Sequence, residues 1–257
     1  MGLFTSRKRI PFLVMAGLFL WVHASRPEPK FQGQSASSIR VLVVTGGHAF
    51  EQKPFFEMFG SFDGMEIREA VQPKADSLLV PELKTSCDVV VFYDYVQKIT
   101  LEQKNAFVNL LQKGIGVLFL HHSICSYQDW DEYETIVGGR YHLKAGTKDG
   151  RAFEASTYKH DVEVPVHVVD PGHPVVQGIQ DFILHDEAYG KYEVLPDMHP
   201  LLETDHPESA KTIGWWHVYG KSPIVFIQLG HDHWAYEHPM FRKLVRQAIV
   251  WVSRIKQ

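Results

Sequence analysis

The chain has 257 residues, of which 45% are hydrophobic, 12% aromatic and 22% charged. This composition is typical of a globular protein with a large core and excludes an intrinsically disordered chain. The formal net charge is −4, so no basic excess indicates a nucleic-acid partner. Two cysteines are too few for a disulfide framework or a four-cysteine zinc site. The 15 histidines stand out, because histidine titrates near neutrality and binds metals.

Residues 1–24 have the pattern of a secretory signal peptide. The cationic patch Arg7–Arg9 precedes the apolar run Ile10–Val22, and small residues stand three and one positions before a cut after Ala24. The run is shorter than the roughly 20 residues that a membrane-spanning helix needs. We therefore expect export to the periplasm or the extracellular space, with an uncleaved N-terminal membrane anchor as the alternative. Residues 25–38 are rich in Ser, Gln and Pro, which indicates a linker.

Residues 39–257 are expected to form one α/β domain, which begins with alternating strands and helices. Apolar, β-branched runs predict buried strands, and apolar residues at helical spacing predict helices. In chain order the expected elements are strand Ile39–Thr45, helix Gln52–Phe59, edge-like strand Met65–Val71, strand Asp88–Tyr93, helix Thr100–Lys113 and strand Gly116–Leu120. Thr100 and Gln103 form a capping box at the start of the second helix, and Gly114 ends it. This order predicts parallel βαβ units with right-handed crossovers.

The second half of the domain is less regular, and antiparallel strands are expected to extend the sheet. The expected elements are strand Val162–Val169, a turn at Pro171–Pro174, a hairpin of Thr212–Val218 with Ile224–Leu229, and a final helix over Pro239–Ile255. A short apolar segment leads into His185–Tyr189, which we expect to be a loop.

Histidines and acids follow four of the expected strands. In open parallel sheets, ligands bind beyond the carboxyl ends of the strands, and these ends share one edge. The polar segments are Gly46-Gly47-His48, Asp94-Tyr95, His121-His122-Ser123 and Gly230-His231-Asp232-His233, and the loop adds Asp186, Glu187 and Tyr189. The glycine pair alone fits a simple turn and the two acids a solvated surface pair, yet the coincidence of four strand ends predicts a functional cleft.

The residue types in this cleft suit two kinds of chemistry. Neutral imidazoles and carboxylates bind divalent zinc, manganese or nickel, and they equally serve metal-free acid–base catalysis. The sequence contains no HExxH, GxGxxG, P-loop or GxSxG motif, so no nucleotide cofactor is expected. Nearby aromatic residues favour a small-molecule carbohydrate as the ligand.

Roles can be assigned to these residues by position and reach. The expected catalytic residues are His48, His122, Glu187 and His231, and the expected metal ligands are His48, His122 and His231. The expected substrate-binding residues are Gly47, Asp94, Tyr95, His121, Asp186, Tyr189 and His233. Adjacent strand residues point to opposite faces, so only one of His121 and His122 should face the cleft. We expect His122 to face the cleft, because Ser123 leads into the loop. We expect Glu187 rather than Asp186 to act in catalysis, because its side chain is longer.

At this point the sequence resembles the ThuA-like, or trehalose-utilisation, family over about residues 39–254. The order and spacing of several short blocks carry the resemblance. These blocks are Val41–His48, Gly114-x-Gly116-Val117 with Leu120-His121-His122, Gly138-Gly139, His173-Pro174 followed by Asp186-Glu187-x-Tyr189, and Leu229-Gly230-His231. The resemblance implies a flavodoxin-like, doubly wound sheet with helices on both faces and added antiparallel strands, as in class I glutamine amidotransferases. It also implies a role in sugar metabolism, with keto-disaccharides such as 3-ketotrehalose as substrates.

The sequence departs from the amidotransferase pattern at the nucleophile. Those enzymes place a cysteine in a Gly-x-Cys-x-Gly elbow, whereas this turn is Leu120-His121-His122-Ser123 and Cys125 lies beyond it. Three hypotheses follow: an exported hydrolase, lyase or isomerase of keto-glycosides, a non-catalytic carbohydrate-binding or accessory module, and a cysteine hydrolase that uses Cys125. The sequence leaves the oligomeric state open, a homodimer included.

Overall fold

The computed structural model describes residues 2, 38–148 and 150–254. The chain divides into two units, 1–35 and 36–257, and every element below belongs to the second. The expected signal peptide, and the linker as far as residue 37, lie outside the described residues. Among the helices that are described, none is long and apolar enough to cross a membrane.

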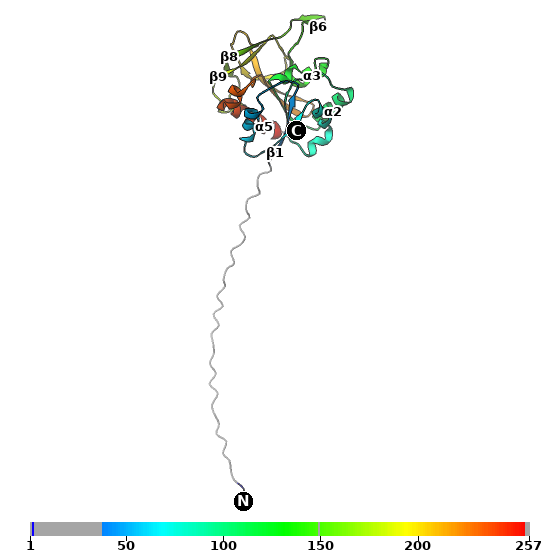
Figure 1. Ribbon diagram of the computed structural model, residues 1–257, viewed down its shortest axis with the longest axis vertical. Coiled ribbons are helices and arrows are strands. Elements are labelled where there is room, and N and C mark those ends of the chain that lie inside the picture. Colours follow the sequence, from blue (N-terminus) through cyan, green and yellow to red (C-terminus); the bar gives the residue numbers. More distant parts are fainter. Residues whose placement is uncertain (1, 3–37, 149, 255–257) are drawn as a thin grey trace. The chain divides into compact units, whose positions relative to one another are not determined.

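A mixed sheet of nine strands forms the centre of the described domain (Figure 1). Five neighbouring strands are parallel, in the order β2 (Met65–Val71), β1 (Ile39–Gly46), β3 (Val89–Asp94), β4 (Gly116–Leu120) and β13 (Ser222–Ile227). The sheet continues with four strands, each antiparallel to the one before it: β12 (Thr212–Tyr219), β11 (His199–Glu203), β8 (Thr157–Val168) and β9 (Phe182–Gly190). Two small pairs lie apart from it: β5 (Gly139–Arg140) with β10 (Glu193–Val194), and β6 (Gly146–Lys148) with β7 (Arg151–Phe153).

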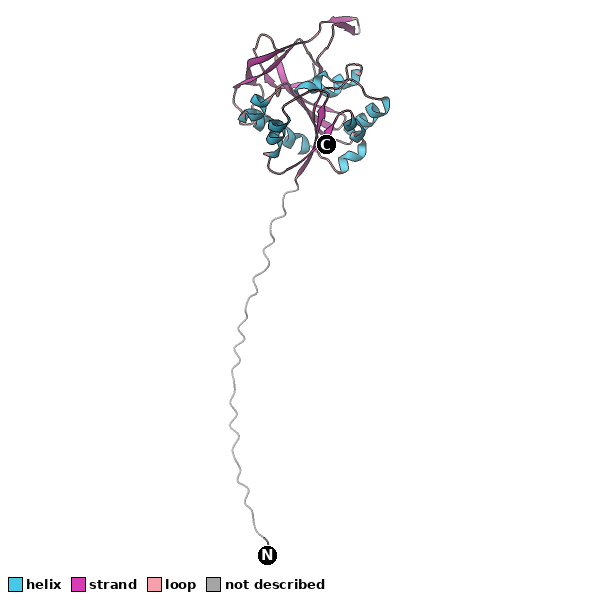
Figure 2. Cartoon of the chain, in the orientation of Figure 1, coloured by secondary structure: helices cyan, strands magenta, loops and turns pink. Residues whose placement is uncertain are grey.

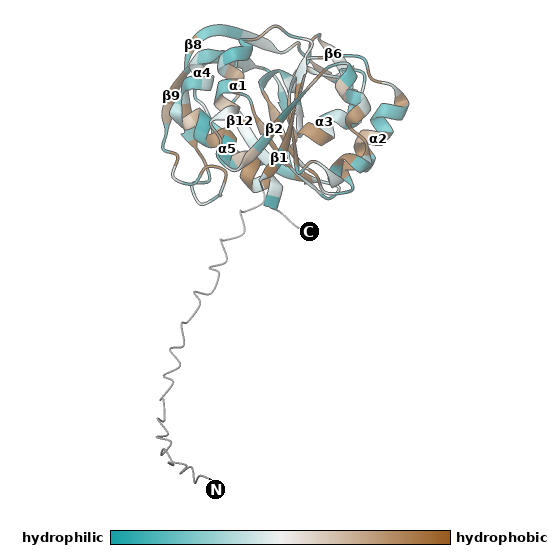
Figure 3. Cartoon of the chain, turned by 60° about the horizontal axis from the view of Figure 1, so that its bottom comes forward, coloured by the Kyte–Doolittle hydropathy of each residue, from teal (hydrophilic) through white to brown (hydrophobic). Residues whose placement is uncertain are grey.

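Helices cover both faces of the parallel strands, as Figures 2 and 3 show. On one face α1 (Gln52–Gly60), α4 (His233–Glu237) and α5 (Pro239–Arg254) contribute to one apolar cluster; on the other, α2 (Leu101–Leu111) and α3 (Asp131–Val137) contribute to a second. Strand β1 serves both clusters, since Val41 and Val43 pack in the first and Leu42 and Val44 in the second. This alternation is why its sequence is continuously apolar. Three 3₁₀ helices complete the fold: η1 (Lys74–Leu78), η2 (Pro81–Thr85) and η3 (His121–Cys125).

The expected fold class is confirmed, including the parallel core, the helices on both faces and the added antiparallel strands. The capping box of α2 is present: the Gln103 amide donates to Thr100 Oγ1 at 3.2 Å, and the Thr100 amide donates to Gln103 Oε1 at 2.8 Å. The helix ends at Leu111 rather than at Lys113. The expected hairpin also forms, with Trp216 opposite Val225.

The expectation of a loop over His185–Tyr189 is wrong. These residues lie within β9, which pairs antiparallel with β8 from Thr157 opposite Gly190 to Val166 opposite Phe182. Strand β8 itself begins five residues earlier than expected. Both errors have one cause, because polar residues suggested exposure in segments where the side chains are paired or face a cavity.

Candidate functional site

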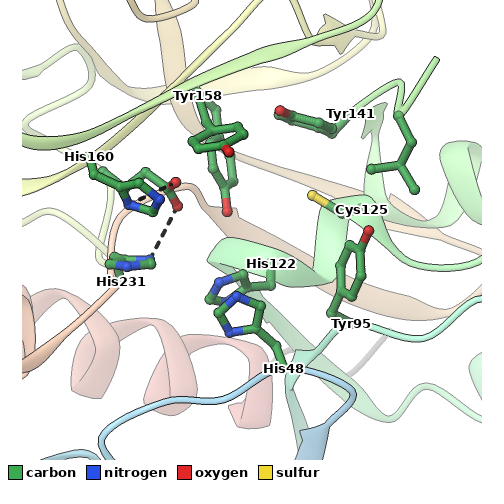
Figure 4. A pocket seen from close by; sticks show the side chains of 11 residues that line it. His48, Tyr95, His122, Cys125, Tyr141, Tyr158, His160 and His231 are labelled. Carbon is green, nitrogen blue, oxygen red and sulfur yellow. Dashed lines mark ion pairs between the residues drawn. The ribbon is translucent and has the colours of Figure 1, made fainter.

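A cavity of about 300 Å³ lies where the carboxyl ends of the parallel strands meet β8 and β9. Strands β1, β3, β4 and β13 are neighbours, so the segments that follow them gather at one edge. The side chains that line the cavity come from seven separate segments (Figure 4): His48, Tyr95, His122, Cys125, Tyr141, Leu143, Tyr158, His160, Glu187, Tyr189 and His231. The cavity therefore combines imidazoles, one carboxylate and four phenol rings.

His48 reaches the cavity because the chain turns sharply after β1. Gly47 has φ +79°, and a Cβ there would lie 1.8 Å from the carbonyl oxygen of Tyr95. The loop after β1 can pass the loop after β3 only because residue 47 has no side chain. The ring centroids of His48 and His122 are 3.9 Å apart, and those of His48 and His231 are 6.4 Å apart. Gly47 thus positions His48, although it does not line the cavity itself.

Both histidines after β4 belong to the site, in different ways. Strand β4 ends at Leu120, and η3 begins at His121 with φ +46°, so the strand alternation that would separate the two rings does not apply. The His121 side chain is fully buried behind the cavity and stacks on Tyr189, with ring centroids 4.7 Å apart. His122 is 4% exposed and lines the cavity. Within the described part of the chain, neither ring nitrogen of His122 has a hydrogen-bond partner.

Asp186 and Glu187 have separate tasks because they are neighbours in a strand. Glu187 Oε2 lies 3.0 Å from His121 Nε2 and 3.2 Å from His231 Nδ1, and Glu187 Oε1 lies 3.1 Å from His160 Nδ1. Asp186 is buried and accepts three backbone hydrogen bonds instead, from Gly230 at 2.8 Å and from His231 and Glu187 at 2.9 Å each. Asp186 therefore holds the segment that carries His231, while Glu187 faces the histidines.

Tyrosine hydroxyls fix the same segment through its carbonyl groups. The Tyr93 hydroxyl lies 2.9 Å from the Gly230 carbonyl oxygen, and the Tyr236 hydroxyl donates to the His231 carbonyl oxygen at 2.9 Å. Asp186 accepts hydrogen bonds from the backbone amides of Gly230 and His231, and the two tyrosine hydroxyls lie at their carbonyl oxygens. The backbone that carries His231 therefore has hydrogen-bond partners for both its N–H and its C=O groups. The position of the His231 ring is therefore set by buried groups.

The charges in the cluster are strongly coupled. Burial alone would raise the pKa of Glu187, but its contacts with His121 and His231 and their charges bring that pKa well below its usual range. Burial would lower the pKa of His231, but Glu187 reverses the effect and raises it. Burial and the neighbouring histidines lower the pKa of His122 well below its usual value, and burial also lowers that of His48. The cluster thus holds an anionic carboxylate, with the pKa of His231 shifted toward the protonated ring and those of His48 and His122 toward the neutral ring.

Four of these residues could together hold a metal ion. One ligand atom from each of His121, His122, Glu187 and His231 lies within 4.8 Å of the others, and no second such group occurs among the residues that the structure describes. The expected ligand set was His48, His122 and His231. His48 is not in the group, so we replace it by His121 and Glu187.

Some expected substrate-binding residues lie away from the cavity. The Asp94 side chain is fully buried and accepts a hydrogen bond from Gln72 Nε2 at 3.0 Å, and burial raises its pKa to about 7. His233 was expected to bind substrate, but it begins α4, and its Nδ1 lies 2.8 Å from Glu51 Oε2. Tyr95 and Tyr189 do line the cavity.

Sequence reasoning missed three polar side chains of the cavity: Tyr141, Tyr158 and His160. The last two come from the start of β8, where the register shifts between Lys159 and Val162 and Asp161 has φ +55°. Such a bulge turns a side chain toward a site. The spacing of Tyr158 and His160, two residues apart, was a strand signal that their polarity obscured.

Cys125 lines the cavity wall, but burial raises the pKa of its thiol well above the usual value. A thiol that stays protonated at neutral pH is a poor nucleophile. The structure therefore adds nothing in favour of a cysteine hydrolase.

The doubly wound sheet, with its cavity at the carboxyl edge, defines an α/β protein of the class I glutamine amidotransferase-like type with histidines in place of the cysteine elbow. The sequence model of the ThuA family, described as trehalose utilisation, matches residues 40–252. The chain belongs to the ThuA family, and this membership implies a carbohydrate-related function.

Solved structures support the fold. A ThuA-like protein from Parabacteroides merdae is 18% identical with a TM-score of 0.69, covering 86% of this chain and 92% of that one. A ThuA-like protein from Bacteroides uniformis is 17% identical with a TM-score of 0.64, covering 86% and 95%. A β-galactosidase from Rahnella is 9% identical with a TM-score of 0.53, covering 82% of this chain and 30% of that one. A search of curated proteins by sequence found no match.

Proposed function

We propose that this protein is a sugar-metabolising enzyme that acts on a glycoside or a keto-sugar, such as a 3-keto-disaccharide. The observation that supports it best is the cavity itself, in which four tyrosines surround an imidazole–carboxylate cluster. The ThuA family match points to the same class of ligand.

The tyrosines suit the two kinds of surface that a sugar presents. Tyr95, Tyr141, Tyr158 and Tyr189 offer ring faces to the C–H groups of a pyranose and phenol hydroxyls to its oxygens. The cavity volume of about 300 Å³ is at the lower end for small-molecule sites. It would therefore enclose one sugar ring and leave the rest of a disaccharide outside.

The histidines supply the chemistry in this proposal. A ketone makes the neighbouring C–H group acidic, so a positioned imidazole can remove that proton and start isomerisation or elimination of the glycosidic substituent. His48 is placed for this role because it lines the cavity and burial lowers its pKa, which favours the neutral ring that accepts a proton. Glu187 and His231, in direct contact at 3.2 Å, would return a proton or bind a substrate oxygen.

Export remains part of the proposal. The cationic patch and apolar run in residues 1–24 support it, and an exported enzyme would meet glycosides before uptake.

Turnover of a defined panel tests the function. Purified protein is incubated with 3-ketotrehalose, other 3-keto-disaccharides and the parent disaccharides, and products are followed by mass spectrometry. We expect turnover of keto-sugars, a loss of about a hundredfold or more in His48→Gln, and full activity in His167→Gln, a surface histidine paired with Asp181. Calorimetric binding of the sugars without any turnover would instead support the carbohydrate-binding module.

A further inference from the structure

We infer that a divalent first-row transition-metal ion binds at the floor of the cavity, held by His121 Nε2, Glu187 Oε2 and His231 Nδ1, with His122 as a fourth ligand. The inference deepens the proposed function. Any role of the ion in sugar chemistry rests on that function, but the binding of the ion does not.

The spacing of the first three atoms is that of ligands around one ion. His121 Nε2 lies 3.0 Å from Glu187 Oε2 and 3.2 Å from His231 Nδ1, and the last two atoms are 3.2 Å apart. Zinc bonds to nitrogen and oxygen are about 2.0–2.2 Å long, so neighbouring ligand atoms around one ion are separated by about 3.0–3.4 Å. The three atoms therefore match one face of a tetrahedral or octahedral ion.

The protons of His121 point to the same conclusion. Its Nδ1 contacts the carbonyl oxygen of Gln228, which can only accept, so Nδ1 carries a proton. Nε2 is then the nitrogen available to a cation, and it faces Glu187 Oε2 and His231 Nδ1. The Tyr189 hydroxyl, at 3.1 Å from Nε2, is a neutral donor beside this group. One proton joins only two of the three atoms His121 Nε2, Glu187 Oε2 and His231 Nδ1, whereas a cation placed between them would contact all three.

His122 provides an independent observation. Its side chain is 4% exposed, and both ring nitrogens lack a hydrogen-bond partner among the described residues. Burying an unpaired imidazole nitrogen is costly, yet one of these nitrogens lies within 4.8 Å of the three atoms above. A metal ion gives this nitrogen the partner that the surrounding side chains do not.

Outer contacts around the cluster are those of a metal site. A metal-bound histidine usually donates its second ring N–H to a carbonyl or carboxylate, as His121 does to Gln228. His160 Nδ1 lies 3.1 Å from Glu187 Oε1 and so orients the carboxylate from its far side. Three imidazoles and one carboxylate suit zinc, manganese or nickel. Because His122, Glu187 and His231 line the cavity, a substrate oxygen could reach the ion.

Metal content of the full-length protein tests the inference without reference to turnover. The chain is purified without chelator and assayed by plasma mass spectrometry. It is then stripped with dipicolinate and titrated with zinc, manganese and nickel in turn. We expect about one ion per chain in the wild type, loss of binding in Glu187→Gln and His231→Gln, and weakening of about 10–100-fold in His160→Gln. The matched control is His142→Gln, since this buried histidine also contacts a glutamate, Glu193, outside the cluster.

The outcomes separate the two proposals. Failure of the wild type to bind any of the three metals stoichiometrically would overturn the inference, as would unchanged binding in Glu187→Gln and His231→Gln. Should one of these variants fail to fold, the other decides. A bound ion without turnover of any sugar leaves the inference standing and refutes the proposed function. Undiminished sugar turnover by stripped protein supports the proposed function and excludes a role for the ion in it, while the metal titration alone decides whether the ion binds.

Discussion

Replacing Asp186 by Asn tests how the segment that carries His231 is held. Asp186 Oδ1 accepts the His231 and Glu187 amides, and Oδ2 accepts the Gly230 amide. An asparagine has only one acceptor oxygen, which can still accept hydrogen bonds from the His231 and Glu187 amides. Its NH₂ group then faces the Gly230 N–H, and two donors cannot form a hydrogen bond. The loss of one buried hydrogen bond to a charged acceptor costs about 1.5–3 kcal/mol. The smaller cost of burying an amide offsets part of this, so we expect a net loss of about 2 kcal/mol.

Thermal and urea unfolding measure the effect. For a domain of this size each kcal/mol lowers the melting temperature by about 2–4 °C, so Asp186→Asn should melt about 4–8 °C below the wild type. Asp63→Asn is the matched control, because Asp63 is exposed and its substitution should change stability by less than about 0.5 kcal/mol. If Asp186→Asn melts no lower than the control, the three amides do not depend on the carboxylate and the reasoning fails.

Four further predictions concern other parts of the chain. Gly47→Ala should cost roughly 2 kcal/mol or more in urea unfolding, because its Cβ would meet the Tyr95 carbonyl oxygen at 1.8 Å; an unchanged midpoint would contradict the close approach. Cys125→Ser should keep most sugar turnover, and a loss of about a thousandfold with the fold intact would restore the nucleophile hypothesis. Thr100→Ala should lower stability by about 1 kcal/mol in thermal unfolding, whereas Thr100→Ser should not. N-terminal sequencing of natively produced protein should begin near residue 25, and an intact N-terminus in a soluble cytosolic fraction would argue against export.

The parallel half of the fold could be predicted because local patterns and burial agree there. Strands such as Gly116–Leu120 are apolar on both faces, and the capping box at Thr100 marks a helix start. Their carboxyl ends must share an edge, so the histidines near it could be grouped before any coordinates were known. Which of His121 and His122 lines the cavity could not be predicted, because it depends on a 3₁₀ turn that begins at His121 and not on strand alternation.

Strand β9 and the start of β8 escaped prediction, because the polar residues in them have partners that lie far away in the sequence. In β9, Asp186 and Glu187 are buried, but partners such as Gly230 and His121 come from segments more than 40 residues away in sequence. In β8, the bulge near Asp161 breaks the alternation that would have revealed His160. Sequence patterns treat buried acids such as Asp186 and Glu187 as exposed, since the groups that compensate their burial are not local.

The cavity joins the two halves of the sheet: His121, His122 and His231 follow parallel strands, whereas Glu187 belongs to the antiparallel strand β9. A small molecule or ion that contacts both sets binds the folded chain and has no equivalent site in the unfolded one. At about 100 times its dissociation constant it adds about 2.7 kcal/mol to the unfolding free energy, or about 5–11 °C in melting temperature for a domain of this size. The melting temperature thus reports how much of the cavity is occupied. Candidate sugars and metals can be ranked by the rise in melting temperature that they cause, before any reaction is known.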